Sequence, residues 1–542
     1  MDFPWLTLVI FLPLLGVPVL LVAKGIDDRS ARGIGVAVTV LTLLASIGML
    51  VQFDTVAAGN QLVDRAVWVE SLGLQYFVGV DGISVWLVML TTFMMPVAIF
   101  LSGGITKQVR LYIAASLVLE TAVLGAFLSL DLLLFFVFFE ALLVPMFLLI
   151  GVWGSTRRIY AAVKFFLYTM AGSAFLLVGI FVLYVLSGDE LGRATFDLTQ
   201  LQQLDLPPGT ARWLFVAFFV AFAVKAPLFP VHTWLPDAHT EAPTKGSVVL
   251  AALLLKTGTY GMIRFNLTLF PEASSYFADV IAVLAVIGII YGAIVAAMQT
   301  DLKRLIAYSS VSHIGFVVLG IFALTEQGMS GSVLQMVNHG LSTGLLFICV
   351  GLLYDRTHTR EMSEMGGLAT TMPLLAAMFL LATLSSIGLP GLNNFVGEFL
   401  VILGTFSVHE VLGAFAALGV ILGAIYMLWA YQRTWQGAEK PAWAHLPDIG
   451  RWEAAAMGLV VVVMIAIGVY PKLLLDRVNP ATDRVVARVV CADATTFGTD
   501  GSQVLAAPPE AEAPAVEGGE DPGRANCDEA FAPGQTTEEG TP

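Results

Sequence analysis

Long apolar stretches follow one another along most of the chain, and the short segments between them hold most of the charged residues. Windows of about 20 apolar residues, the length needed to cross the hydrocarbon core of a bilayer, recur about fourteen times. They lie near residues 5–23, 33–52, 83–103, 111–130, 132–153, 162–187, 212–240, 244–265, 276–299, 305–325, 330–354, 371–405, 410–432 and 452–471. This pattern predicts an all-α polytopic membrane protein with about 14 transmembrane helices.

Two of these windows contain residues that break helices. The seventh, 212–240, holds Pro227 and two further prolines, and the twelfth, 371–405, holds the sequence GLPG around Pro390. Proline removes a helix hydrogen bond, so the freed carbonyls need polar side chains, water or a lined cavity. Matching interruptions in two halves of a chain are typical of transporters built from inverted repeats. We therefore expect broken helices seven and twelve.

The composition excludes an ordinary soluble protein, because 57% of the 542 residues are hydrophobic and only 13% are charged. The first window lacks the positive leader of a signal peptide and is long enough to span, so we expect it to remain as a helix. The net charge of −14 arises largely after Pro508, where nine acidic residues accompany a single arginine. We expect residues 476–542 to be an acidic tail that is disordered or depends on a partner. The sequence holds no basic patch for nucleic acid.

The loops carry an uneven distribution of positive charge. One alternate set of loops holds fifteen Lys and Arg residues, and the other set holds four. Because Lys and Arg remain on the cytoplasmic side, we expect both termini on the outer face.

The three cysteines, Cys349, Cys491 and Cys527, show no metal or cluster spacing, and the chain has no phosphate-binding glycine loop. We therefore expect no redox centre, metal or cofactor in this chain. With the tail outside, Cys491 and Cys527 could pair in an oxidising compartment.

Ionisable residues inside the spanning windows form the candidate site. A charge in the bilayer costs several kcal/mol, so each is a site hypothesis by default. Structural ion pairs and satisfied core histidines are the alternative explanation for any one of them. Together they favour function, because packing alone is achieved with Leu, Gly and Ala. The set consists of Glu120, Glu140, Lys225, Lys256, His313, His339 and Glu398.

The spacing of these groups repeats between the two halves. Lys225 follows Glu140 by 85 residues, and Glu398 follows His313 by the same number. Opening or closing a pair between Glu140 and Lys225 would change the proton affinity of the lysine, which suits a proton carrier. Hydroxyl groups near His313 could extend the path, although Ser and Thr in membrane helices often bond their own backbone.

Several long stretches resemble the antiporter-like membrane subunits of respiratory complex I, over roughly residues 1–475. These stretches are FFVFFEALLVPMFLLIGVWG, RRIYAAVKFFLYTMAGS, VKAPLFPVHTWLPDAHTEAPTKGSVVLAALLLKTGTYGMIR, LKRLIAYSSVSHIGFV and GLPGLNNFVGEF. The resemblance implies two inverted five-helix repeats. The implied parts are residues 1–110 with helices one to three, 111–265 with the first repeat, 276–432 with the second repeat, 452–475 with helix fourteen, and the tail 476–542.

Carried onto matching positions, the resemblance implies a role for each candidate. Glu140 and Lys225 form the input pair, Lys256 is the central relay, and Glu398 is the terminal group. His313 and His339 lie along the central hydrophilic axis. Secondary candidates are Glu120, His232, Tyr308, Ser309 and Ser312.

The chain looks most similar to the M-type members of this family. They have Glu where Glu398 stands, whereas L-type and antiporter chains usually have Lys, and the long lateral helix of the L type is absent. The resemblance implies a bacterial inner membrane, L-type and N-type neighbours, and FMN, iron–sulfur clusters and quinone in partner subunits. A subunit of a multisubunit Na⁺/H⁺ antiporter and a structural scaffold remain alternative hypotheses.

Overall fold

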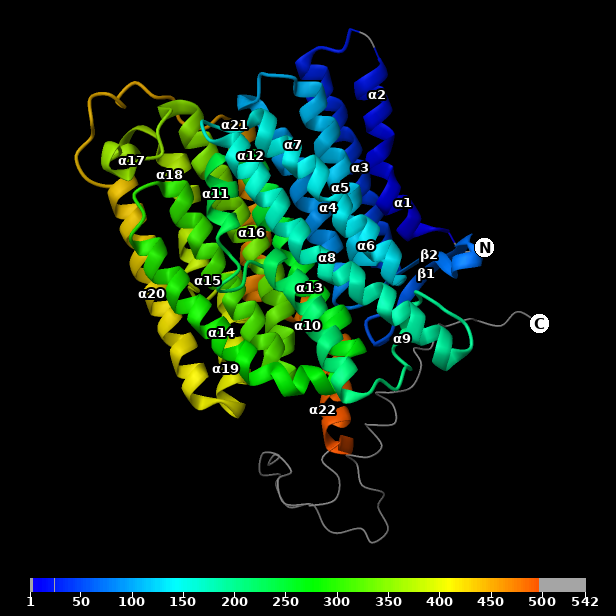
Figure 1. The fold of residues 1–542 in the computed structure, drawn as a ribbon. Coiled ribbons are helices and arrows are strands. Elements are labelled where there is room, and N and C mark those ends of the chain that lie inside the picture. The colour runs from blue at the N-terminus through cyan, green and yellow to red at the C-terminus, as the bar shows by residue number, and fades with distance from the viewer. Residues whose placement is uncertain (1–2, 24, 497–542) are drawn as a thin grey trace.

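The computed structural model describes residues 3–23 and 25–496, and it is built almost entirely of helices (Figure 1). In these residues, twelve helical stretches are long and apolar enough to cross a membrane. They are α1–α2 (Trp5–Val22), α3 (Asp28–Gln52), α5 (Val109–Leu128), α6–α7 (Leu132–Trp153), α8 (Arg158–Leu191), α10 (Pro208–Lys225), a stretch containing α13 (Gly246–Leu267), α14 (Pro271–Ala297), α15 (Leu302–Phe322), α16 (Glu326–Thr357), α20 (Glu410–Trp435) and α21 (Arg451–Val469).

Three shorter apolar helices lie within the third and twelfth windows of the sequence. They are α4 (Ser84–Phe100), α18 (Pro373–Ser386) and α19 (Asn393–Val408). The all-α polytopic fold is confirmed, and the count of fourteen crossings stays a prediction.

The helices differ in how much of their surface other helices cover. The hydrophobic windows of α15 and α16 are 94% and 100% buried, whereas those of α20 and α21 are 33% and 28% buried. The outer helices present Leu, Val and Phe side chains outward, as a lipid-facing surface requires. The central helices carry polar groups, which would be costly against lipid.

The start of α6 is tied to the segment before the short helix α9 (Leu198–Leu201). Asp131 caps α6 by accepting hydrogen bonds from the amides of Leu133 and Leu134. Two antiparallel backbone hydrogen bonds join 130–132 to 196–198.

The start of α15 repeats this arrangement in the second half. Asp301 caps α15 by accepting from the amides of Lys303 and Arg304, and two backbone hydrogen bonds join 300–302 to 360–362. The latter segment precedes α17 (Leu368–Thr371), which lies at the opposite end of the bundle from α9 (Figure 1). The same hydrogen-bonding pattern thus occurs at opposite ends, as inverted repeats require.

One end of the bundle carries two elements that hydropathy did not predict. Strands β1 (Gln61–Val69) and β2 (Leu74–Val80) pair as an antiparallel hairpin. Helix α22 (Lys472–Thr496) corrects the expectation of a tail from residue 476. It forms because apolar positions recur every three or four residues, and Leu474, Val478 and Ala481 among them are buried.

Residues 497–542, which include Cys527 of the expected cysteine pair, lie outside the described residues. Cys491 is disulfide-bonded, and Cys349 is a free, buried thiol.

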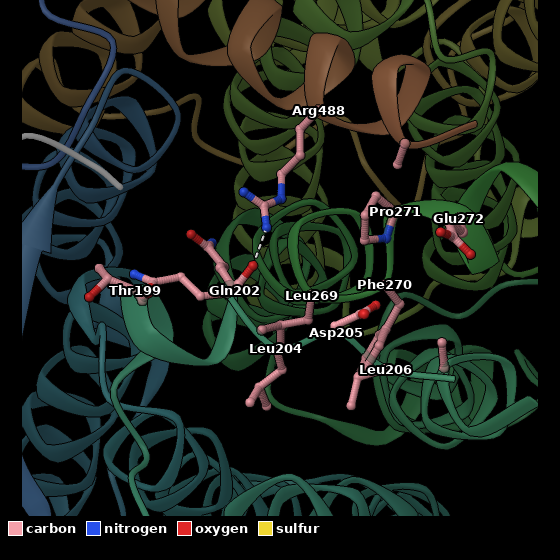
Figure 2. A pocket seen from close by; sticks show the side chains of 13 residues that line it. Thr199, Gln202, Leu204, Asp205, Leu206, Leu269, Phe270, Pro271, Glu272 and Arg488 are labelled. Carbon is pink, nitrogen blue, oxygen red and sulfur yellow. Dashed lines mark hydrogen bonds between the residues drawn. The ribbon is translucent and has the colours of Figure 1, made fainter. Parts of the chain in front are cut away.

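A cavity of about 410 Å³ lies between α22, the segment after α9 and the start of α14 (Figure 2). Arg488 extends from α22 across it and donates to the carbonyls of Gln202 and Thr268. Burial lowers the pKa of Arg488 to about 10, and the neighbouring charge of Arg484 acts in the same direction. None of the candidate residues lines this cavity, and the bonds of Arg488 attach α22 to the bundle beside it.

Candidate functional site

Lys225 and Glu140 interact through space without forming an ion pair in this structure. Lys225 is the last residue of α10 and is 2% exposed, and Glu140 lies near the end of α6 (Leu132–Ala141). In the described residues the Lys225 ammonium has no hydrogen-bond partner, and neither has the buried Glu140 Oε1. The ammonium lies 4.5 Å from the centroid of the Phe139 ring. Glu140 is nevertheless the charged group that acts on Lys225 through space, so the structure holds the pair open.

The backbone beyond Lys225 leaves the helix and resumes as α11 (Trp234–Glu241). The Ala223 carbonyl, which Pro227 cannot satisfy, accepts from the Leu228 amide at 2.9 Å. The Val224 carbonyl accepts from the Trp234 indole at 2.8 Å. These two carbonyls at the break are thus bonded at membrane depth, where no bulk water would satisfy them.

An ion pair that sequence reasoning missed holds α11 against α8. Lys164 of α8 donates to the Thr233 carbonyl at 2.9 Å and pairs with Asp237 at 2.6 Å. Lys164 stands in the apolar run AAVKFFLY, and this charge inside a spanning window was the available signal.

Lys256 and His339 form the centre of the site. The Lys256 ammonium lies 2.7 Å from His339 Nδ1 and also donates to the Ala251 carbonyl. That carbonyl belongs to a π-helical turn, Leu250–Leu254, which precedes α13 (Leu255–Gly261). Such turns often occur at functional sites. Lys256 and His339 are fully buried.

His313 links this centre to Glu398. The rings of His313 and His339 have centroids 5.6 Å apart. His313 Nδ1 lies 3.0 Å from Glu398 Oε1, and its Nε2 lies 3.1 Å from the Ser386 hydroxyl. Gln335 of α16 also donates to Glu398 Oε1 at 3.0 Å. Polar groups from α13, α16, α15 and α19 therefore form one buried row, which we call the central row: Lys256, His339, His313 and Glu398.

The second break, between α18 and α19, is closed by asparagines. Asn393 donates to the Asn338 carbonyl at 3.1 Å, and Asn338 donates back to the Asn393 carbonyl at 2.7 Å. The Ser385 hydroxyl donates to Asn393 Oδ1 at 2.7 Å. These bonds attach the start of α19 to α16, and so they help to position Glu398 beside His313.

Three of the secondary candidates, Tyr308, Ser309 and Ser312, lie on α15 with His313. Ser309 and Ser312 donate to backbone carbonyls, and Tyr308 is half-buried. Glu120 is fully buried on α5, and neither carboxylate oxygen has a hydrogen-bond partner within the part of the chain described. His232 is 3% exposed and its ring lies 5.1 Å from that of Tyr291.

A second histidine in the segment VHTWLPDAHTEAP was also missed. His239 of α11 is fully buried, and neither ring nitrogen has a hydrogen-bond partner among residues 3–23 and 25–496. Its ring stacks on Phe347 at 4.6 Å, and Lys303 and Lys256 are the charges that act on it. The sequence feature that could have marked His239 as a candidate was its position in the same segment, seven residues after His232. The same residues contain no group of three or more side chains suited to hold a metal ion.

Comparison with known proteins places this site in a family. Residues 129–425 match the model of the family described as NADH:quinone oxidoreductase/Mrp antiporter, TM. The chain is 45% identical to NADH-quinone oxidoreductase subunit M of Rhodobacter capsulatus over 89% of this chain and 96% of that protein. It is 43% identical to NADH-ubiquinone oxidoreductase chain 4 of Marchantia polymorpha over 88% of this chain and 96% of that protein.

Solved structures show the same fold. A chain of respiratory complex I from Thermus thermophilus with bound NADH superposes with a TM-score of 0.81 at 32% identity, over 89% of this chain and 99% of that chain. A chain of the Mrp complex from a Dietzia species gives a TM-score of 0.80 at 23% identity, over 90% of this chain and 98% of that chain. The second likeness concerns the fold alone.

Proposed function

The chain belongs to the family of NADH-quinone oxidoreductase subunit M, a proton-pumping membrane subunit, and from this premise we propose a path for the protons. Glu140 and Lys225 form the input pair, and its opening releases a proton from Lys225 toward Lys256. The proton then passes along the central row, through His339 and His313, to Glu398. Other membrane subunits of the complex are the partners of this chain.

The central row is the observation that carries this proposal. Lys256, His339, His313 and Glu398 come from four helices, yet they follow one another in space. The Lys256 ammonium lies 2.7 Å from His339 Nδ1, the two imidazole centroids are 5.6 Å apart, and His313 Nδ1 lies 3.0 Å from Glu398 Oε1. An imidazole has one ring nitrogen that can accept a proton and one that can donate it, and the two histidines lie between a lysine and a carboxylate. Groups that only held helices together would need to form separate pairs, and they would not need to form a continuous row of four.

The redox chemistry belongs to partner subunits in this proposal. FMN, iron–sulfur clusters and quinone are held there, and this chain has no redox centre of its own. Quinone reduction triggers the opening of the Glu140–Lys225 pair. The membrane is the bacterial inner membrane, with both termini on the outer face, as the positive charge of the alternate loops supports.

The test compares proton uptake into inverted membrane vesicles that carry Lys225→Ala with uptake in the unchanged complex. Lys440→Ala is the matched control, because Lys440 bonds the Ser363 carbonyl in an exposed loop. Assembly of the complex and NADH oxidation by an artificial acceptor are measured in parallel. We expect pumping and quinone reduction to fall together with assembly intact. Unchanged pumping would show that Lys225 is structural and refute the path.

A Na⁺/H⁺ antiporter is the second candidate, and it is favoured by the description of the matching family, which names the Mrp antiporter beside NADH:quinone oxidoreductase. That function predicts transport that depends on Na⁺ and proceeds without NADH. Vesicles that pump with NADH in the absence of Na⁺ would exclude it.

A further inference from the structure

The contact between Lys225 and Phe139 is left unexplained by the proton path. A buried ammonium without a hydrogen-bond partner is costly, and in the part of the chain that the structure describes the face of the Phe139 ring offers it an attraction in addition to the charge of Glu140. The negative face of the ring attracts a cation within about 6 Å of the centroid. At 4.5 Å, the Lys225 ammonium lies well inside this range.

The Phe139 ring is held in place by its neighbours. It stacks with Phe135 at a centroid distance of 5.3 Å and meets Phe222 edge-on at 5.9 Å and 89°. Phe139 is 1% exposed, so it has little freedom to turn away. The ring therefore presents a fixed face to the end of α10.

Phe139 and Glu140 are consecutive residues of one helix, and both act on the same lysine. Successive side chains of an α-helix point about 100° apart, so the ring face and the carboxylate are adjacent positions for the flexible Lys225 side chain. A lysine side chain has several rotatable bonds and can move between them while α10 stays in place.

We propose that Phe139 is a positioning residue that holds the Lys225 ammonium on its ring face whenever the Glu140–Lys225 pair is open. This inference rests on the proposed proton path and deepens it. The Lys225 ammonium then alternates between the Glu140 carboxylate and the Phe139 ring face, and the ring keeps the open state populated. Without the ring, the ammonium of the open state would face apolar side chains, and the closed pair would be favoured.

The expected size of the effect follows from the strength of cation–π contacts. Replacing the ring by an aliphatic side chain should shift the balance toward the closed pair by about 30-fold, which corresponds to about 2 kcal/mol at 1.4 kcal/mol per tenfold. Because pair opening is a step of the path, NADH-driven pumping and quinone reduction should slow together by up to this factor.

The test compares Phe139→Leu with Phe139→Tyr in the whole complex, in vesicles, with assembly and artificial-acceptor activity measured alongside. Phe218→Leu is the matched control, because Phe218 is fully buried on α10, contacts Phe222 and meets no cation among the described residues. We expect slow pumping for Phe139→Leu, near-normal pumping for Phe139→Tyr and near-normal pumping for the control. If Phe139→Leu fails to assemble, Phe139→Met takes its place with the same expectations.

Each contrary result has a separate meaning. Normal pumping by Phe139→Leu, or equal losses in Phe139→Leu and Phe139→Tyr, would overturn the role of the ring. Equal losses in Phe139→Leu and the Phe218→Leu control would reduce the contact to packing and overturn it as well. The variant Lys225→Ala is run beside them: if it pumps normally, the proton path itself fails, whichever way the phenylalanine variants behave.

Discussion

Gly258 lets the helix that carries Lys256 approach the end of the helix that carries Lys225. A Cβ added at Gly258 would lie 2.6 Å from the Ala226 amide nitrogen and 2.7 Å from the Phe222 carbonyl oxygen. Both are backbone atoms, which cannot rotate away. Ordinary contact begins at 3.4 Å, so Gly258→Ala has to separate the two helices by about 0.8 Å, at a cost typical of overpacking, about 1–3 kcal/mol.

This displacement acts directly on the proposed transfer between the two lysines. Ala226 follows Lys225, and Gly258 lies two residues after Lys256. Misplacement of reacting groups by about 1 Å can reduce a rate on the order of 10²-fold. We therefore expect Gly258→Ala to lower NADH-driven pumping by about 10- to 100-fold, with a smaller loss of assembled complex.

The assay measures proton uptake per assembled complex in inverted vesicles. Gly288→Ala is the control, since a Cβ at that helical position would have its nearest neighbour at 3.7 Å. If Gly258→Ala pumps as fast as Gly288→Ala at equal assembly, the close approach of α10 and α13 is not needed for transfer, and the reasoning is refuted.

Three further predictions concern other parts of the structure. Glu398→Gln keeps a hydrogen-bonding group beside His313 and removes the carboxylate, so pumping should be lost while the complex assembles; normal proton uptake would contradict this. Asn393→Leu removes the bonds that attach α19 to α16, which should cost about 1–3 kcal/mol and lower the yield of assembled complex on native gels. Burial raises the pKa of Asp131 to about 6, so the native state binds the extra proton and stability should fall as pH rises from about 4 to 6. Asp131→Asn, which can still cap α6, should flatten this part of a thermal-unfolding profile, and an unchanged slope would count against the assignment.

The membrane fold was predictable because hydropathy reports burial in lipid directly, and the candidate charges were conspicuous for the same reason. Their contacts were not predictable. His313 and Glu398 are far apart in sequence, and only the packing of α15 against α19 brings them to 3.0 Å. Phe139 lies in a run of apolar residues that predicts a lipid-facing helix, so nothing in the local sequence indicates that its ring contacts Lys225.

Helix α22 was missed for a different reason. Its charged residues, both basic and acidic, lower its mean hydropathy below that of the spanning windows. The spacing of Leu474, Val478 and Ala481 does indicate an amphipathic helix, because it repeats with the period of a helix. Charge content alone is thus a poor guide to whether a segment of a membrane protein is helical.

The π-helical turn before Lys256 affects how this lysine can gain and lose a proton. The turn gives the ammonium a backbone acceptor, the Ala251 carbonyl, in addition to His339. One partner is permanent, because it is part of the main chain, and the other can turn away or accept a proton itself. A departure of His339 therefore takes the lysine from two acceptors to one, and never strands a bare cation in the bilayer. The turn keeps one hydrogen bond on the Lys256 ammonium while its bond to His339 breaks and forms again.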